Sequence, residues 1–190
     1  MRVVAGELRG RRIDAPEGDS TRPTTDKVRE AIFNALGSLG ALDDARVVDL
    51  FAGSGGLGIE ALSRGAARCT FVENDWRALG VLRGNVANLG LAERSNVVVA
   101  DLVRESAAGD SLRLRELLAG ATLVLADPPY GFPGWTEIFS AATSADPDVV
   151  LVVETEARAV IHASVPPGWK SVRQREYGRT TVGFYVREGE

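Results

Sequence analysis

A glycine-rich loop directly after an apolar run is the feature that most constrains how this chain can fold. The apolar run ends at Asp49, and the loop continues as Leu50-Phe51-Ala52-Gly53-Ser54-Gly55-Gly56-Leu57-Gly58. Residues 46–51 are predicted to form a buried strand, and the apolar spacing over residues 57–64 predicts a helix. A strand, a tight glycine turn and a helix in this order form the nucleotide-binding corner of Rossmann-like α/β folds.

Strand and helix patterns alternate along the rest of the chain. The strands predicted from apolar runs are residues 68–72, 96–100, 122–126 and 149–153, and the helices predicted from spacing are residues 25–36, 76–89, 112–118 and 135–142. Alternating residues over 171–187 predict a closing hairpin. We therefore expect an α/β fold of the class I S-adenosylmethionine-dependent methyltransferase type, Rossmann-like, with a mostly parallel seven-stranded sheet and a C-terminal β-hairpin.

The N-terminal residues depart from this alternating pattern. Short extended pieces around Gly6 and Gly10 predict a small β-hairpin, followed by a polar turn at residues 17–20. We expect two parts, an N-terminal β-hairpin extension at residues 1–20, for which the family resemblance given below implies RNA contact, and a methyltransferase domain at residues 21–190. The arginines of the extension are Arg2, Arg9, Arg11 and Arg12. Charge alone leaves two interpretations open for them, a solvated face or a grip on RNA phosphates.

Composition excludes several classes of protein. The chain has 190 residues, of which 45% are hydrophobic and 25% charged, and a net charge of −4, as in an ordinary globular domain. With one cysteine, Cys69, and one histidine, an intrachain disulfide is impossible, and neither a zinc site nor a histidine-based triad is expected. Cys69 lies in an apolar run and should be a buried thiol. No apolar run could span a bilayer and no signal-peptide pattern is present, so we expect a cytoplasmic protein without membrane or metal partners.

Acidic residues at the ends of predicted strands separate two candidate cofactors. The loop glycines also fit the dinucleotide pattern G-x-G-x-x-G, and Glu73 follows about 20 residues later, as that pattern requires. Asp49 would repel a pyrophosphate, whereas it suits the amino and sulfonium groups of S-adenosylmethionine. Glu73 can accept both ribose hydroxyls, and Asp101 can accept the adenine amine. We therefore expect S-adenosylmethionine as the cofactor, with contacts from Asp49, Gly53, Gly55, Gly58, Glu73 and Asp101.

A second motif follows the fourth predicted strand and reads Asp127-Pro128-Pro129-Tyr130. An exocyclic amine is a poor nucleophile, and the Asp127 carboxylate and the Pro128 carbonyl can each accept one of its N–H groups. This would aim the nitrogen lone pair at the methyl group, so that catalysis comes from positioning and electrostatics. The prolines stiffen the turn, and Tyr130 offers a face for stacking a flipped base. The motif does not name the base, because similar turns serve adenine N6, guanine N2 and glutamine amide targets.

Four segments make the sequence resemble a known family. They are residues 2–11 (Arg-Val-Val-Ala-Gly-Glu-Leu-Arg-Gly-Arg), residues 22–34 (Arg-Pro-Thr-Thr-Asp-Lys-Val-Arg-Glu-Ala-Ile-Phe-Asn), residues 49–55 (Asp-Leu-Phe-Ala-Gly-Ser-Gly) and residues 60–66 (Glu-Ala-Leu-Ser-Arg-Gly-Ala). They closely resemble the bacterial small-subunit rRNA guanine-N2 methyltransferases of the RsmD type, over residues 2 to about 130. The resemblance implies methylation of the N2 amine of one guanine in 16S rRNA, on an assembled or partly assembled 30S subunit.

The same resemblance implies further site residues. The segment from Arg22 to Thr25 would lie over the cofactor pocket. The additional cofactor-binding residues are Phe51, Asn74, Leu102, Arg22 and Thr24, and the RNA-binding residues are Arg2, Arg9, Arg11, Arg12 and Arg29. We expect a monomer, with ribosomal proteins next to the target contributing to docking.

Three other functions compete with this one. An adenine-N6 DNA methyltransferase would use the same Asp127 motif but normally needs a larger target-recognition insertion. A non-catalytic RNA-binding Rossmann-like module would have no use for an intact motif. A dehydrogenase would need a proton-transfer residue that the sequence does not place near the two loops.

Overall fold

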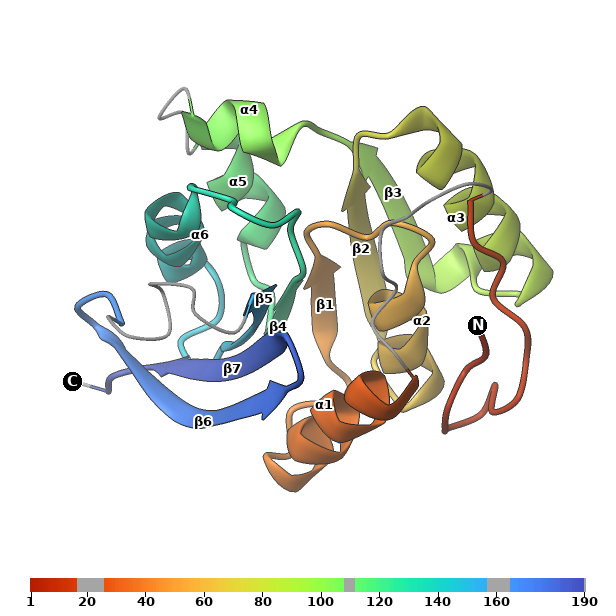
Figure 1. The fold of residues 1–190 in the computed structure, drawn as a ribbon, viewed down its shortest axis with the longest axis horizontal. Coiled ribbons are helices and arrows are strands. Elements are labelled where there is room, and N and C mark those ends of the chain that lie inside the picture. The colour runs from red at the N-terminus through yellow and green to blue at the C-terminus, as the bar shows by residue number, and fades with distance from the viewer. Residues whose placement is uncertain (17–25, 108–111, 157–164, 190) are drawn as a thin grey trace. The chain divides into compact units, whose positions relative to one another are not determined.

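The computed structural model describes residues 1–16, 26–107, 112–156 and 165–189, and the chain divides into two compact units, with the boundary between Ala100 and Asp101. Figure 1 shows the strands and helices of both units. The expected boundary at residue 20, between the N-terminal extension and the methyltransferase domain, stays a prediction. Within the described residues, no helix is long and apolar enough to cross a membrane.

The first unit is built on three parallel strands. These strands are β1 (Arg46–Asp49), β2 (Arg68–Glu73) and β3 (Ser95–Val99), paired in the order β3-β2-β1. The helices are α1 (Asp26–Ser38), α2 (Gly56–Ser63) and α3 (Trp76–Asn88), with a short 3-10 turn η1 (Ala92–Arg94) before β3. The apolar residues of β1 and β2 are buried, as expected for parallel strands that helices cover. Asp75 begins α3 because its side chain accepts hydrogen bonds from the N–H groups of Arg77 and Ala78.

The N-terminal segment, residues 1–14, lies against α2 and α3 and folds back on itself. Arg2 and Arg12 form an antiparallel bridge, flanked by hydrogen bonds from the Val3 N–H to the Arg11 carbonyl at 2.9 Å and from the Ile13 N–H to the Met1 carbonyl at 3.0 Å. The expected hairpin is therefore present as this short pairing, without longer regular strands. Further along the segment, the N–H groups of Val4 and Ala5 donate to the Glu60 carboxylate of α2, at 2.8 and 3.0 Å.

The second unit contains four strands in the order β4-β5-β7-β6. The strands are β4 (Leu123–Ala126), β5 (Val150–Glu156), β6 (Trp169–Tyr177) and β7 (Thr180–Arg187), where β4 and β5 are parallel and the other pairs are antiparallel. The closing hairpin expected from the alternating sequence is therefore confirmed. The helices are α4 (Leu102–Ala107), α5 (Leu112–Leu118) and α6 (Trp135–Ala141), followed by the 3-10 turn η2 (Ala142–Ser144). Phe139 of α6 packs edge-on against Trp169 and Tyr185, with ring centroids 5.2 Å apart in both pairs.

Helix α4 and the end of strand β1 are two of the places where the structure differs from the sequence-based prediction. Helix α4 was not predicted, because its six residues are too few for a visible apolar period. Strand β1 ends at Asp49, two residues earlier than expected, because the chain turns at Leu50 into the glycine-rich loop. The carboxylate of Asp49 therefore stands at the very end of the strand.

Candidate functional site

The glycine-rich loop is tied to the end of β2 by Glu73. One oxygen of the Glu73 carboxylate accepts the N–H of Gly53 at 2.7 Å, and the other accepts the N–H groups of Asn74 and Asp75, both at 2.8 Å. Gly53 has a positive φ of 53°, and a side chain at this position would meet nothing within 4 Å. Glu73 is half-buried. Its carboxylate is thus held in one orientation beside an open part of the loop, with lone pairs left to accept further hydroxyl groups.

Asp49 is the last residue of β1, and its carboxylate lies at the start of helix α2. Its side chain is 1% exposed, and Oδ2 accepts the N–H of Gly58 at 2.9 Å. A dinucleotide pyrophosphate would need the N–H groups in this first helical turn. Because the protein's own carboxylate already takes one of them, the helix start is negatively charged and suits a cationic ligand better than a pyrophosphate.

Close packing explains why two of the loop residues are glycines. Gly55 has a φ of 90°, and a Cβ atom there would lie 2.6 Å from Leu82. At Gly58, a Cβ atom would lie 2.3 Å from the ring of Phe71 and 2.6 Å from the sulfur of Cys69. Cys69 is buried, as predicted, and burial, together with the nearby Asp49 carboxylate, raises the pKa of its thiol well above the ordinary value.

Asn85 of α3 connects the glycine-rich loop to the N-terminal segment. Its side-chain amide donates to the carbonyl oxygens of Ser54, at 2.9 Å, and of Asp14, at 3.0 Å, and its oxygen accepts the Asp14 N–H at 2.9 Å. Asn85 is 3% exposed. Sequence reasoning missed this residue, because a single asparagine in a helix gives no signal of which backbone groups it will satisfy.

Four further residues of the first unit were expected to bind the cofactor, and the structure describes two of them. Phe51 is half-buried in the loop, and Asn74 is exposed directly after Glu73. Arg22 and Thr24 lie outside the described residues. Their expected place over the cofactor pocket stays a prediction.

The second unit carries the other expected residues. Asp101 is half-buried, and its carboxylate accepts the N–H of Arg104 at 3.0 Å, so it caps α4, whose first residue Leu102 is buried. Asp127 follows β4 directly and is half-buried, while Pro128 is buried. The Pro129 carbonyl accepts the N–H of Phe132 at 3.2 Å and closes the turn.

Tyr130 projects from this turn with 66% of its surface exposed. Its ring face is accessible to a planar group, and its hydroxyl remains in contact with water. The turn thus presents a carboxylate and an accessible aromatic ring within four residues, Asp127 to Tyr130. This arrangement can accept hydrogen bonds from a planar amine and stack on its ring.

The expected RNA-binding arginines divide into two groups. Arg2, Arg9, Arg11 and Arg12 are exposed. Arg29 is 1% exposed and is directed inward, where it donates to the backbone carbonyl of Arg2 and to Asp26, and faces Glu60 at 3.5 Å. An RNA contact by Arg29 does not fit this position, and we correct its role to holding the N-terminal segment on α1 and α2.

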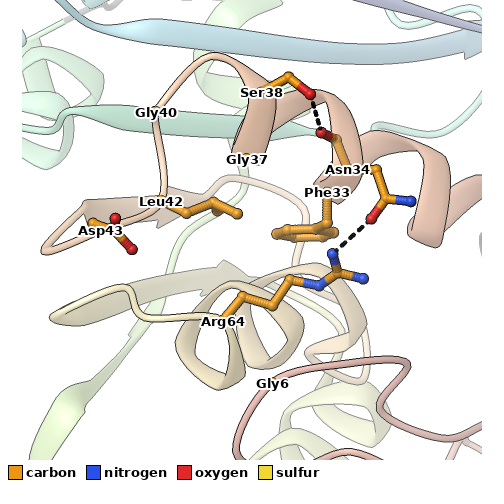
Figure 2. Close-up of a pocket in the computed structure, with 9 residues that line it drawn as sticks. All are labelled: Gly6, Phe33, Asn34, Gly37, Ser38, Gly40, Leu42, Asp43 and Arg64. Carbon is orange, nitrogen blue, oxygen red and sulfur yellow. Dashed lines mark hydrogen bonds between the residues drawn. The ribbon is translucent and has the colours of Figure 1, made fainter.

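A pocket of about 600 Å³ lies elsewhere in the first unit and contains none of the expected site residues. Figure 2 shows its lining, where Arg64 donates to the Asn34 side chain at 3.0 Å and lies over the ring of Phe33. Arg64 also pairs with the buried Glu60 at 2.7 Å. Arg64 therefore connects α1 with α2 beside this pocket.

Comparison with known proteins identifies the family to which the chain belongs. A sequence model of the family described as "Conserved hypothetical protein 95" matches residues 1–186. The ribosomal RNA small subunit methyltransferase D of Escherichia coli K12 is 32% identical over 194 residues, which cover 100% of this chain and 91% of that protein. YlbH of Bacillus subtilis, named as a candidate rRNA methyltransferase, is 37% identical over the full length of both chains. The solved structure of the E. coli protein yhhF, described as a candidate methyltransferase, has a TM-score of 0.81 and 30% identity, and covers 100% of this chain and 99% of its own.

The fold and the two loops define a class I methyltransferase of the Rossmann-like type, as the sequence predicted. The match over residues 1–186, together with the identity to full-length relatives, makes the assignment more specific. The chain belongs to the RsmD-type family, the "Conserved hypothetical protein 95" family.

Proposed function

We propose that this protein uses S-adenosylmethionine to methylate the exocyclic N2 amine of a guanine in small-subunit ribosomal RNA, within an assembled or partly assembled 30S subunit. Family membership supports the general activity, because full-length relatives carry rRNA methyltransferase names. The observation that carries the proposal is the Asp127–Tyr130 turn after β4, with its half-buried carboxylate and its exposed ring.

The residues of the first unit fit S-adenosylmethionine. Glu73 presents a carboxylate of fixed orientation for the ribose hydroxyls, and the space beside Gly53 is open. Asp49 places negative charge at the start of α2, which favours a cationic ligand over NAD. When bound, this cofactor supplies an electrophilic methyl group on a positively charged sulfur.

The proposed chemistry follows from the residues of the turn. The guanine amine donates its two N–H groups to the Asp127 carboxylate and the Pro128 carbonyl, which directs the nitrogen lone pair at the methyl carbon. The nitrogen would take up the methyl group that S-adenosylmethionine supplies, with a neutral thioether as the by-product, and would then carry the positive charge beside the Asp127 carboxylate. One N–H proton then leaves, first to Asp127 and then to water. Asp127 stabilises charge that appears only during transfer, so its effect belongs to the transition state.

The test is single-turnover transfer of a labelled methyl group to small subunits that lack the modification, followed by nucleoside mass spectrometry. We expect N2-methylguanosine. Asp127→Ala should reduce the rate by at least ~100-fold with nearly unchanged cofactor affinity. Tyr130→Phe should remain close to wild type, and Tyr130→Ala should weaken capture of the base. A rate for Asp127→Ala within a few-fold of wild type contradicts the catalytic role, and N6-methyladenosine as the product would favour the adenine-N6 alternative.

The cofactor assignment has its own test by calorimetry. Glu73→Ala should weaken binding of S-adenosylmethionine by about tenfold or more, because charged hydrogen bonds to the ribose are lost and the loop at Gly53 is released. Glu73→Gln, which keeps the size of the side chain, should lie between Ala and wild type. Unchanged affinity in folded Glu73→Ala, or tight binding of NAD by the wild type, would refute the assignment.

A further inference from the structure

An exposed aromatic–arginine pair begins helix α3. Because β1 and β2 are parallel neighbours, the pair lies at the same edge of the sheet as the glycine-rich loop. Trp76 follows Glu73 by three residues and is 73% exposed. The guanidinium carbon of Arg77 lies 5.2 Å from the centre of the Trp76 ring. The hydrogen bonds from Arg77 and Ala78 to Asp75 fix the first turn of the helix and hence the direction in which this pair points.

The exposed face of α3 carries two basic residues and no acidic one. The helix sequence, Trp-Arg-Ala-Leu-Gly-Val-Leu-Arg-Gly-Asn-Val-Ala-Asn, carries Arg77 and Arg83 and no acidic residue, although the chain has a net charge of −4. Both arginines are exposed, and neither pairs with a carboxylate among the residues that the structure describes. Positive charge is therefore concentrated on this face against the overall balance of the protein.

The N-terminal segment adds a further arginine at the far end of the same helix. Arg11 is exposed and donates to the backbone carbonyl of Asn88, the last residue of α3, at 3.0 Å. Figure 1 shows the N-terminal trace running beside α3, in agreement with the hydrogen bonds between Asp14 and Asn85. Trp76 and Arg11 thus mark the two ends of one surface, and Arg77 and Arg83 lie between them.

The middle of this surface leaves room for a ligand to approach the helix. Gly80 and Gly84 follow Trp76 at intervals of one helical turn and are exposed, and a Cβ atom at either would meet nothing within 4 Å. Arginines that neutralise phosphates and an aromatic ring that stacks on a base together recognise single-stranded nucleic acid.

We propose that the exposed face of α3, from Trp76 to the Arg11–Asn88 contact, is an RNA-docking surface. A base next to the target stacks on Trp76, and the adjoining phosphates lie against Arg77, Arg83 and Arg11. This proposal rests on the proposed function and assigns to it a surface outside the catalytic turn. It also gives a purpose to the Asn85 contacts, which hold this helix, the basic N-terminal segment and the cofactor loop in one arrangement.

The experiment measures binding of small subunits that lack the modification, together with S-adenosylmethionine affinity by calorimetry, for the full-length protein and four variants. Trp76→Ala should weaken subunit binding by about tenfold, the scale of one lost base–aromatic stack. Trp76→Phe should recover most of it. Gly84→Glu places a negative charge on the exposed face and should weaken binding by about tenfold. Gly84→Gln, of the same size but neutral, should weaken binding clearly less than Gly84→Glu, because it fills the same space without adding the negative charge. Cofactor affinity should be unchanged in all four.

Two results would overturn the surface while leaving the proposed function intact. In the first, Trp76→Ala and Gly84→Glu bind and methylate subunits as the wild type does. In the second, Trp76→Ala loses cofactor affinity and keeps subunit affinity, which would assign the ring to the cofactor pocket. Failure of the wild type itself to bind or methylate subunits would refute the proposed function and this surface together.

Discussion

Glu60 and Arg29 form an ion pair that is removed from solvent: Nε of Arg29 lies 3.5 Å from Oε2 of Glu60, and their side chains are 1% and 0% exposed. The same Glu60 carboxylate accepts the N–H groups of Val4 and Ala5 and pairs with Arg64. One buried acid thus joins α1, α2 and the N-terminal segment. The arginines of that segment therefore owe their position to a carboxylate that is buried inside the protein.

Glu60→Ala should lower the free energy of unfolding by about 3–5 kcal/mol, because it leaves the Arg29 charge buried without its carboxylate. The matched control is Asp26→Ala, which removes another partner of Arg29 whose side chain is 61% exposed, and which should cost at most about 1 kcal/mol. Denaturant unfolding of both variants measures the difference. Equal losses of unfolding free energy in Glu60→Ala and Asp26→Ala would show that burial of the Glu60–Arg29 pair is not what makes it important.

Gly6→Ala and Gly10→Ala should separate close packing from backbone strain. Both glycines have a φ of 82°, but a Cβ atom on Gly6 would lie 1.8 Å from the carbonyl oxygen of Ser63, whereas one on Gly10 would meet nothing within 4 Å. Gly10→Ala should therefore cost about 1–2 kcal/mol of left-handed strain. Gly6→Ala should cost more and should release residues 1–14 from α2. Limited proteolysis of this segment, with unfolding curves, provides the measurement, and similar behaviour of both variants would argue against the packing at Ser63.

Asn85→Ala should loosen the glycine-rich loop and the N-terminal segment at once. The loss of a buried amide with hydrogen bonds to Ser54 and Asp14 is expected to cost about 1–3 kcal/mol. Asn88→Ala, an exposed position on the same helix, is the control and should be close to neutral. Amide hydrogen exchange should show faster exchange at both contact regions in Asn85→Ala. Faster exchange at neither region would remove the connecting role.

Alkaline pH should destabilise the protein through Tyr185. This side chain is buried, and burial raises its pKa from 10.0 to about 12. The folded state holds the proton more tightly than the unfolded state, so stability is complete below pH 10.0 and falls as the pH rises from 10.0 to about 12. The loss is at most about 3 kcal/mol. In Tyr185→Phe, unfolding curves at successive pH values should show a smaller loss over this interval, and an identical loss would assign the effect to other groups.

Several features of the site could be predicted from local sequence. The acids at Asp49, Glu73 and Asp101 end or follow strands, and the parallel register of β1, β2 and β3 is what a βα repeat produces. The tight turn after β1 was predicted from its glycines, because a backbone with positive φ and a close helix contact both favour glycine. The closing hairpin β6–β7 was equally visible as residue alternation. These features have short-range causes.

The role of Arg29 could not be predicted in this way. Its RNA-binding role was expected from the family resemblance of residues 22–34, which does not show which way a side chain points. Only the packing of α1 on α2 directs its guanidinium toward Glu60 and the N-terminal backbone. Trp76 and Asn85 were overlooked for the same reason, since a sequence does not state which face of a helix is left exposed and which is covered by a segment 71 residues away.

The sequence by itself therefore determined the α/β class, the family and the two loops that carry the proposed chemistry, because each depends on residue types at fixed local spacing. Tertiary structure alone decided which charges are buried and which are free. It turned Arg29 and Arg64 inward onto Glu60 and left Arg77 and Arg83 on an exposed face. The physical reason is that desolvation of a charge depends on the segments packed around it, and those segments come from distant parts of the chain.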